Sequence, residues 1–397
     1  MATPSIVVTG MACLCAAGSD PASVVRAMHA GTRRLTPAES IDGRALPFPF
    51  FAVPDACLGG WRTQSALDTF NLARLCVHRA VREAGLTDDI MPHTAMILGT
   101  TSGSALHFLD DYAASRGESL PATMPDRDAY FSHNLAQTVD VPLDAQPGGP
   151  RLTIANACTS GADAVGLALD MLLSGQCECA ICGGADALSL VPHTGFARLM
   201  IFDSEPCRPF DAGRHGLNLG DGAAVLVLER RAHARKRRAK VLGRVLGYGA
   251  AADAHHFTAP HPEGRGLAQA IATALAQARL DYADMAFVNA HGTATRENDR
   301  VEGRLLHSLL PTTPVWACKG VTGHTLGAAG ALEAVLTLEA LRQGSVPPSV
   351  GFAALDKEIG LAPTTAATET ATPFALSTSL GFGGSNAALV LGKGGKA

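Results

Sequence analysis

Residues 151–161 read Arg151-Leu-Thr-Ile-Ala-Asn-Ala-Cys158-Thr-Ser-Gly161, a short apolar run that passes through a cysteine into an Ala/Leu-rich segment. The run predicts a buried strand, and the segment after it predicts a helix that reaches about Ser174. Backbone N–H groups and the helix dipole favour negative charge at such a junction, which would lower the pKa of the Cys158 thiol and make it nucleophilic. The alternative is a small, inert core residue, as most unpaired cysteines are.

The composition is that of an ordinary folded protein. The chain of 397 residues is long enough for two or three average domains or for one large fused core. A formal net charge of −4 gives no reason to expect nucleic acid or an anionic membrane as a partner. Ten cysteines at irregular spacing predict reduced thiols and a cytoplasmic location. No apolar run predicts a membrane span, and the N-terminal stretch lacks the basic residues of a secretory signal.

Strand and helix patterns alternate through the first half of the chain. The expected strands are residues 6–9, 95–98, 179–182 and 223–228, and the expected helices are 21–29, 65–84 and 160–174. Proline-bearing stretches at residues 36–60 and 117–150 interrupt this pattern, and residues 192–222 are expected to form a loop. The basic run 230–240 predicts a solvated helix between two halves, with a docking surface for nucleic acid or a carrier as the alternative.

The second half of the chain repeats these patterns in the same order. Residues 273–288 run helix, loop, strand, as residues 79–98 do. The segment that begins at Gly327 echoes the one at Gly161, and the segment at Gly383 echoes the one at Leu219. Three echoes in one order predict two copies of a βα unit, packed as layers of helices around central sheets, with a site at their junction.

Two histidines lie in glycine-rich turns that follow apolar runs. His291 lies in Asn289-Ala-His-Gly-Thr-Ala-Thr295, and His324 lies in Lys319-Gly-Val-Thr-Gly-His-Thr-Leu-Gly-Ala-Ala-Gly330. Residues at the ends of buried strands are common catalytic positions because a rigid scaffold presents them. Either histidine alone is more often structural. Together with Cys158, in equivalent turns of a duplicated unit, they predict one convergent site.

Five motifs resemble, in order and spacing, those of the elongating β-ketoacyl-acyl-carrier-protein synthases. They are Asn-Ala-Cys158-Thr-Ser-Gly, Asn-Ala-His291-Gly-Thr-x-Thr, Lys319-x-x-Thr-Gly-His324-x-x-Gly-Ala-Ala-Gly, Gly381-Phe-Gly-Gly-Ser-Asn386, and Arg208-Pro-Phe-Asp211 with Leu219-Gly-Asp-Gly222. The resemblance covers nearly the whole chain. It implies the α/β thiolase-like fold, in which two βαβαβαββ halves form a five-layered αβαβα body. Residues 1–235 would be the half with Cys158, and residues 236–397 the half with His291 and His324.

The resemblance also implies a reaction. Cys158 would take an acyl group from a carrier-protein thioester, with the oxyanion between the backbone N–H groups of Cys158 and Phe382. His291 and His324 would bind the thioester carbonyl of malonyl carrier protein and promote its decarboxylation. The enolate would attack the acylated cysteine and extend the chain by two carbons. No metal and no cofactor are expected beyond the phosphopantetheine arm of the acyl carrier protein.

Further residues receive roles by the same resemblance. Lys319 matches a structural lysine that pairs with a carboxylate, here Glu333. Thr293 and Thr295 match residues that hydrogen-bond the phosphopantetheine arm, and Phe382 matches a gate over the acyl pocket. Substrate-contacting positions near that pocket correspond to Thr101 and Ser102. The loop with His255 and His256 resembles one near the pantetheine entrance, with simple surface exposure as the alternative.

Some positions depart from the housekeeping enzymes of fatty-acid synthesis. Leu380 stands where these enzymes more often have an aromatic residue, and residues 101–104 are more polar than their counterparts. The stretch 61–73, which resembles their carrier-docking helix, holds only Arg62 as a basic residue, so docking would use other arginines such as Arg127, or the carrier would be a different one. A second hypothesis therefore stays open. The chain would be the ketosynthase subunit of a specialised polyketide or polyene pathway and would work as a heterodimer with a chain-length-factor-like partner, where the family otherwise implies a homodimer.

Other classes of protein fit the sequence less well. A thiolase needs a second catalytic cysteine near the C-terminus, and residues 381–386 contain none. A chain-length factor lacks the nucleophile, which is present here as Cys158. No Gly-x-Ser-x-Gly elbow supports a serine hydrolase. The spacing of Cys177, Cys179 and Cys182 suggests a metal site, but residues 179–182 are expected to form a strand whose alternate side chains point to opposite faces.

Overall fold

A computed structural model describes residues 5–38, 40–41, 44–46, 48–58, 68–101 and 134–395. Its strands are β1 (Ile6–Cys15), β2 (Ser40–Ile41), β3 (Arg44–Ala45), β4 (Thr94–Gly99), β5 (Arg151–Ile154), β6 (Cys179–Asp186), β7 (Gly222–Arg230), β8 (Gly243–Ala252), β9 (Met285–Asn289), β10 (Val315–Trp316), β11 (Ser345–Val346), β12 (Thr368–Glu369), β13 (Phe374–Gly381) and β14 (Ser385–Lys393).

The helices are α1 (Pro21–His29), α2 (Asp68–Ala84), α5 (Leu135–Thr138), α6 (Ser160–Ser174), α7 (Leu190–Arg198), α8 (Arg231–Lys236), α9 (Arg265–Ala278), α10 (Arg296–Leu309), α11 (Lys319–Thr322) and α12 (Ala329–Gln343). Short 3-10 turns are η1 (Asp55–Cys57), η2 (Met91–His93), η4 (Tyr282–Asp284) and η5 (Leu326–Ala328). Within these described ranges, no helix is both long and apolar enough to span a membrane.

The main sheet is duplicated. It has ten strands in the order β10-β9-β13-β14-β8-β1-β7-β6-β4-β5. Numbered along the chain within each half, both groups of five strands read 1-5-4-2-3 outward from the middle, with the same sequence of antiparallel and parallel pairs. The halves meet where the start of β1 pairs with the start of β8. The predicted repeat of one βα unit is therefore confirmed, whereas a boundary between residues 235 and 236, at the end of α8, stays a prediction.

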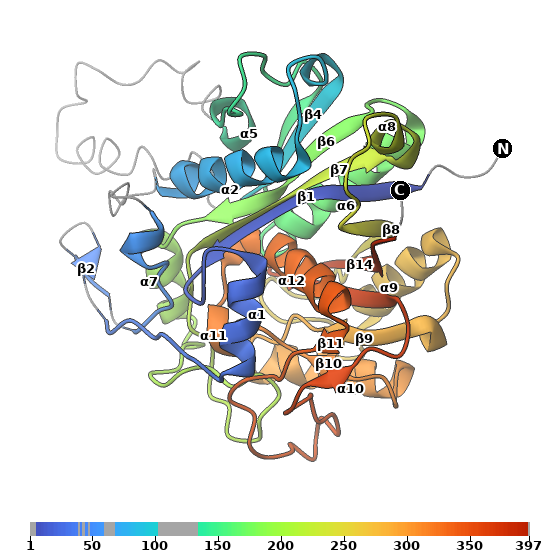
Figure 1. Cartoon of the computed structure of the whole chain (residues 1–397). Coiled ribbons are helices and arrows are strands. Elements are labelled where there is room, and N and C mark those ends of the chain that lie inside the picture. The colour runs from blue at the N-terminus through green and yellow to red at the C-terminus, as the bar shows by residue number, and fades with distance from the viewer. Residues whose placement is uncertain are drawn as a thin grey trace.

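The elements form five layers, which can be followed in Figure 1 from α2 at the top to α9 and α10 below. One apolar cluster joins α2 to the outer face of the first half-sheet. A second joins α9 to the outer face of the other half-sheet. The largest cluster lies between the two half-sheets and contains the buried faces of α6 and α12. The expected αβαβα body is confirmed.

The two central helices approach each other through small residues at their N-terminal ends. A Cβ added to Gly161 would lie 2.7 Å from the carbonyl oxygen of Gly327 and 2.9 Å from the backbone nitrogen of Ala331. A Cβ on Gly330 would lie 2.7 Å from the Cβ of Ala162. Larger side chains would therefore separate α6 from α12. The close approach brings together the two turns that precede these helices, which contain Cys158 and His324.

Several elements differ from the expectation. The strand expected at residues 6–9 continues to Cys15 past a bulge, because β7 pairs along its whole length. The loop expected at 192–222 contains most of α7, in which Pro192 falls in the first turn, where proline is tolerated. No strand was expected where β8 lies, because three of its four buried positions are glycines, Gly243, Gly247 and Gly249, which give no apolar pattern. The predicted Asp20 cap of α1 is confirmed.

The cysteines are not arranged as a metal site. All ten lie within the described ranges and are free thiols. Cys179 packs in the cluster beside α2, and Cys182 packs in the central cluster, so these two thiols point to opposite faces of β6. Thiols on opposite faces of a strand cannot bind one ion. Among the described residues, no group of three or more His, Cys, Asp or Glu side chains is placed to hold a metal ion.

The contact between α6 and α12 yields a stability prediction. Gly161→Ala should lower the thermal midpoint by several degrees, because the added methyl overlaps backbone atoms that move only if the helices separate. Overpacking of this kind costs about 1–3 kcal/mol. Gly195→Ala is the matched control, since Gly195 is an exposed helical glycine with no atom within 4 Å of an added Cβ. The control should be neutral or slightly stabilising. Equal shifts for both variants, measured by calorimetry, would contradict the proposed role of the contact.

Candidate active site

A strained turn presents Cys158. The chain leaves β5 and passes through Ala157, whose φ of 51° lies in the left-handed region that side chains rarely adopt. Ser160 holds the turn, because its hydroxyl donates to the carbonyl of Ala157 at 2.6 Å and accepts the backbone N–H of Asn156 at 2.8 Å. The helix α6 starts two residues after the cysteine. Cys158 therefore lies at a fixed junction of strand and helix, as predicted, but β5 is a partly exposed strand at the edge of the sheet and not the buried strand that was expected.

The Cys158 thiol is protonated in the resting protein. Burial raises the pKa of the thiol to about 12, and this effect outweighs the Lys319 cation and the backbone N–H of Phe382, both of which lower it. The expectation that the helix N-terminus lowers this pKa is therefore wrong for the resting state. The physical reason is that a thiolate loses the solvation of water in a buried site.

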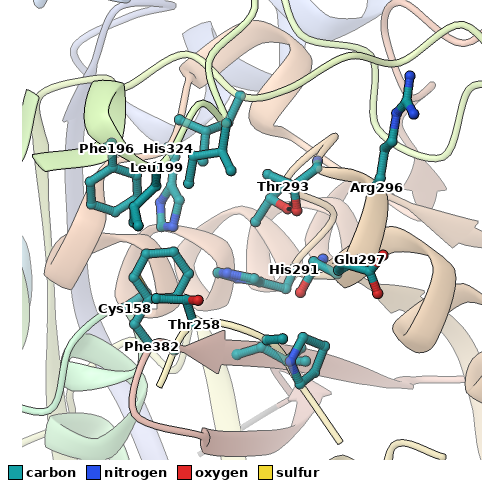
Figure 2. A pocket seen from close by; sticks show the side chains of 18 of the residues that line it. Cys158, Phe196, Leu199, Thr258, His291, Thr293, Arg296, Glu297, His324 and Phe382 are labelled. Atoms are coloured by element: carbon teal, nitrogen blue, oxygen red, sulfur yellow. Dashed lines mark hydrogen bonds between the residues drawn. The ribbon is translucent and has the colours of Figure 1, made fainter. Parts of the chain in front are cut away.

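The rings of His291 and His324 lie edge to face, with centroids 5.1 Å apart. Lys319 Nζ donates to His291 Nδ1 at 3.1 Å, and the backbone N–H of Leu326 donates to His324 Nδ1 at 3.2 Å. A ring nitrogen that accepts a hydrogen bond carries no proton, so the proton of each neutral ring is on Nε2. Burial and the Lys319 cation lower the pKa of both rings well below 6.5. Figure 2 shows both rings beside Cys158 in one cavity.

A buried ion pair supports His291. Lys319 forms a salt bridge with Glu333, and both side chains are almost fully buried. Lys319 Nζ also donates to the carbonyl oxygen of His291 at 2.5 Å. Burial lowers the pKa of Lys319, but the Glu333 carboxylate together with Cys318 and Glu302 raises it overall, so the ammonium group stays charged. The predicted pairing of Lys319 with Glu333 is therefore present, and the lysine contacts His291 at two atoms.

Two buried carboxylates on α10, which the sequence analysis missed, hold the His291 turn. Glu302 accepts the backbone N–H groups of His291 and Gly292, each at 2.8 Å, and the hydroxyl of Thr378 at 2.7 Å. Asp299 accepts the backbone N–H of Ala294 at 3.1 Å. The sequence did contain one signal for them, the spacing of Asp299 and Glu302, because residues three apart on a helix share one face.

Asp186, also missed, joins turns from both halves. It lies at the end of β6 and accepts the hydroxyl of Thr100 at 2.6 Å and the backbone N–H of Thr101 at 2.8 Å. It also accepts the backbone N–H of Gly327, three residues after His324, at 2.6 Å. One carboxyl group thus ties the end of β4 to the His324 turn. Thr101 lies behind the Cys158 turn, with its hydroxyl 3.4 Å from the carbonyl oxygen of Ala157.

A cavity of about 520 Å³ opens from Cys158 and the two histidines. One wall is apolar and comes mainly from α7 and the turn after it, with Phe196, Leu199, Ile201, Leu217, Leu380 and Phe382. The other wall is polar, with Thr258, Thr293, Thr295, Arg296, Glu297 and Asn298. The Phe382 ring stacks on Phe196 at 5.2 Å between centroids, as Figure 2 shows. A cavity of this size and lining fits a slender ligand with both apolar and hydrogen-bonding parts.

Some predicted residues lie elsewhere. Thr101 is not among the residues that line the cavity. Ser102, Arg62 and Arg127 lie outside the described residues. His255 and His256 are exposed, and His256 Nδ1 accepts the backbone N–H of Thr258, which lines the cavity. Leu380 does line the cavity, close to Phe382.

Comparisons with known proteins agree with this geometry. The family model "Beta-ketoacyl synthase, N-terminal domain" matches residues 59–234, and "Beta-ketoacyl synthase, C-terminal domain" matches residues 242–353. The chain is 35% identical over 308 residues to "3-oxoacyl-[acyl-carrier-protein] synthase 2" of Mycobacterium tuberculosis, covering 75% of this chain and 73% of the relative. It is 36% identical over 341 residues to "Putative polyketide beta-ketoacyl synthase 1" of Streptomyces halstedii, covering 80% of each.

Solved structures share the whole fold. "The ishigamide ketosynthase/chain length factor" superposes with a TM-score of 0.85 at 29% identity, covering 99% of this chain and 100% of that one. A beta-ketoacyl synthase from Burkholderia phymatum gives a TM-score of 0.83 at 26% identity, covering 98% and 99%. The fold and the site define a condensing enzyme of the acyltransferase class, with a thiolase-like fold. The chain belongs to the β-ketoacyl synthase family, which confirms the resemblance stated from the motifs.

The raised pKa of Cys158 predicts how the reactivity of its thiol changes with pH. Below the pKa, the thiolate fraction rises tenfold per pH unit, so alkylation of Cys158 by iodoacetamide should rise about tenfold per unit between pH 7 and pH 9. Mass spectrometry of the peptide that contains Cys158 measures the rate, and Cys158→Ala identifies the site. A rate that levels off near pH 7 would mean that the resting thiol is already ionised and would contradict the prediction.

Proposed function

We propose that the chain is a β-ketoacyl-acyl-carrier-protein synthase that joins malonyl carrier protein to an acyl group held on Cys158. The observation that carries this proposal is one cavity that contains a buried thiol and two neutral imidazoles with Nε2–H donors. The thiol suits covalent acyl transfer, and the two donors suit a developing enolate. The names of the relatives at 35% and 36% identity support the same reaction class.

The first step moves an acyl group onto Cys158. The sulfur attacks the thioester carbonyl of the acyl carrier, and negative charge develops on the carbonyl oxygen between the backbone N–H groups of Cys158 and Phe382. The bond from the carbonyl carbon to the pantetheine sulfur then breaks. The proton of the Cys158 thiol ends on the leaving pantetheine thiol, so the step consumes and releases no proton.

The second step forms the new carbon–carbon bond. The malonyl thioester carbonyl accepts hydrogen bonds from Nε2 of His291 and His324 while the malonyl group loses carbon dioxide. The resulting enolate carbon attacks the Cys158 thioester, and the carbon–sulfur bond breaks. One proton is taken up as the Cys158 thiol reforms. The products are carbon dioxide and a β-ketoacyl carrier longer by two carbons.

The remaining residues serve these two steps. Lys319 and Glu333 fix His291 in the tautomer that donates from Nε2. Thr293 and Thr295, with hydroxyls 2.9 Å apart on the polar wall, bind the pantetheine arm. Phe382 covers the acyl side of the cavity. The substrates arrive on phosphopantetheine of an acyl carrier protein, and we propose no other cofactor. Ten free thiols support a cytoplasmic location, because such a compartment is reducing.

A second candidate assigns the same chemistry to a specialised polyketide pathway. Two of the similar solved structures contain a ketosynthase together with a chain length factor, at 29% and 26% identity. Leu380 on the cavity wall also favours a pocket unlike that of the housekeeping enzymes. On this proposal, the chain works as a heterodimer with a chain-length-factor-like partner. A purified homodimer that condenses acyl and malonyl carriers unaided would favour the first candidate.

Acylation tests the role of Cys158. Incubation with a series of acyl carrier proteins should add one acyl mass to the intact chain, because the thioester is covalent. Cys158→Ala should abolish the adduct, whereas Cys57→Ala, which removes a partly exposed thiol, should retain it. An adduct that survives in Cys158→Ala would refute the assignment of the nucleophile. The acyl length that reacts fastest would identify the preferred substrate.

The two histidines should separate decarboxylation from acylation. His291→Ala should lower decarboxylation of malonyl carrier protein by about 100-fold or more, since it removes one donor to the enolate oxygen. Acylation of Cys158 should continue. His307→Ala, an exposed histidine on α10, is the control and should leave both rates unchanged. If His291→Ala abolished acylation and left decarboxylation intact, the division of roles would be wrong.

A further inference from the structure

A hydrogen-bonded chain connects the Cys158 turn with the turn that contains Phe382. Asn156, two residues before the cysteine, donates from its amide to Asp163 Oδ2 at 2.7 Å. The amide oxygen of Asn156 accepts the hydroxyl of Ser385 at 2.9 Å. Thr159 donates to the same Asp163 oxygen at 2.7 Å. This series of hydrogen bonds therefore leads from the first turn of α6, through Asn156, to the first residue of β14.

Tyr248 fixes the other end of this series of hydrogen bonds. Its hydroxyl donates to Asp163 Oδ1 at 2.8 Å. The ring lies against α6 so closely that a Cβ on Gly166 would be 2.2 Å from a ring carbon. Burial and the nearby Asp163 raise the pKa of Tyr248, so its hydroxyl stays a donor at any physiological pH. Asp163 is thus held from β8, in the second half of the chain, as well as from its own helix.

The Phe382 turn needs such support. It contains two consecutive glycines with left-handed backbones, Gly383 at φ 88° and Gly384 at φ 82°. Glycine restricts the backbone least of all residues, so contacts with neighbouring residues have to fix this turn. Phe257 accepts the N–H of Gly383 at 2.7 Å, and Gly384 accepts the N–H of Asp253 at 2.8 Å. The backbone of Gly381 nevertheless approaches Cys158 so closely that an added Cβ would lie 3.2 Å from the Cys158 nitrogen. Ser385 ends this turn.

We propose that Asp163, Asn156, Ser385 and Tyr248 are positioning residues that fix the spacing between the backbone N–H groups of Cys158 and Phe382. This inference rests on the proposed function, in which those two groups bind the oxyanion of acyl transfer. Asn156 is the connecting part, since its amide group contacts Asp163 on one side and Ser385 on the other. Asp163 fixes the orientation of that amide by accepting from its nitrogen.

The proposal separates the two partial reactions. Acyl transfer to Cys158 uses the two backbone donors, whereas decarboxylation uses the Nε2–H groups of His291 and His324. Loss of the hydrogen bonds that join the Cys158 turn to the Phe382 turn should therefore slow acylation and leave decarboxylation of malonyl carrier protein close to the wild-type rate. A general loss of folding would lower both rates together. The ratio of the two rates is thus the informative measurement.

The experiment removes the hydroxyl of Ser385. In Ser385→Ala, we expect acylation of Cys158, followed by intact mass, to fall at least tenfold, because a displacement of about 1 Å at a reacting group can cost about a hundredfold. Ser385→Thr keeps the hydroxyl and should restore most of the rate. Tyr248→Phe removes the anchor of Asp163 and should also slow acylation, by a smaller factor. Decarboxylation should change less than twofold in all three variants.

The matched control is Ser174→Ala, which removes a serine hydroxyl that donates to a carbonyl at the far end of the same helix. It should leave both rates unchanged. Equal losses of acylation and decarboxylation in Ser385→Ala, or no loss of acylation, would overturn the proposal. Failure of the proposed function itself would look different, because the wild-type chain would then form no acyl adduct.

Discussion

The close contact between the N-terminal ends of α6 and α12 is the constraint on which the site depends. Gly161 and Gly330 allow backbone atoms of the two helices to meet with no side chain between them. Each helix begins just after a turn that contains a reactive residue, Cys158 in one case and His324 in the other. Because each turn is fixed to the start of its helix, the packing of the helices determines how far the thiol lies from the His324 imidazole.

Burial then determines the protonation states. The same loss of water raises the pKa of Cys158 and lowers the pKa of His291 and His324, because it disfavours every charged form. Lys319 remains charged since Glu333 pairs with it. The resting site is therefore a neutral thiol and two neutral donors beside one neutralised cation. Such a site stabilises charge as it develops during the reaction and holds little of it beforehand.

The motifs predicted much of the fold and the reactive residues. Glycine-rich turns after apolar runs are visible in one sequence, and their repetition indicated the duplication that the strand order confirms. The thiol pKa was predicted wrongly, because a strand–helix junction in the sequence does not show how deeply it is buried. Asp186, Glu302 and Asp163 were missed for a related reason. Most of their partners are backbone N–H groups and side chains that only the folded chain brings within reach, and the one local signal was the spacing of Glu302 from Asp299.

Asp186 connects the two halves of the molecule through its hydrogen bonds. Its carboxyl group accepts hydrogen bonds from both halves, from Thr100 and Thr101 of the first and from Gly327 of the second. A first half separated from the second would lose the hydrogen bond from Gly327, and the second would expose the start of α12. Each hydrogen bond to a buried carboxyl group contributes to stability, so the contact through Asp186 stabilises both halves. We therefore expect the two copies to unfold together, and the reactive residues come together only when both copies are folded.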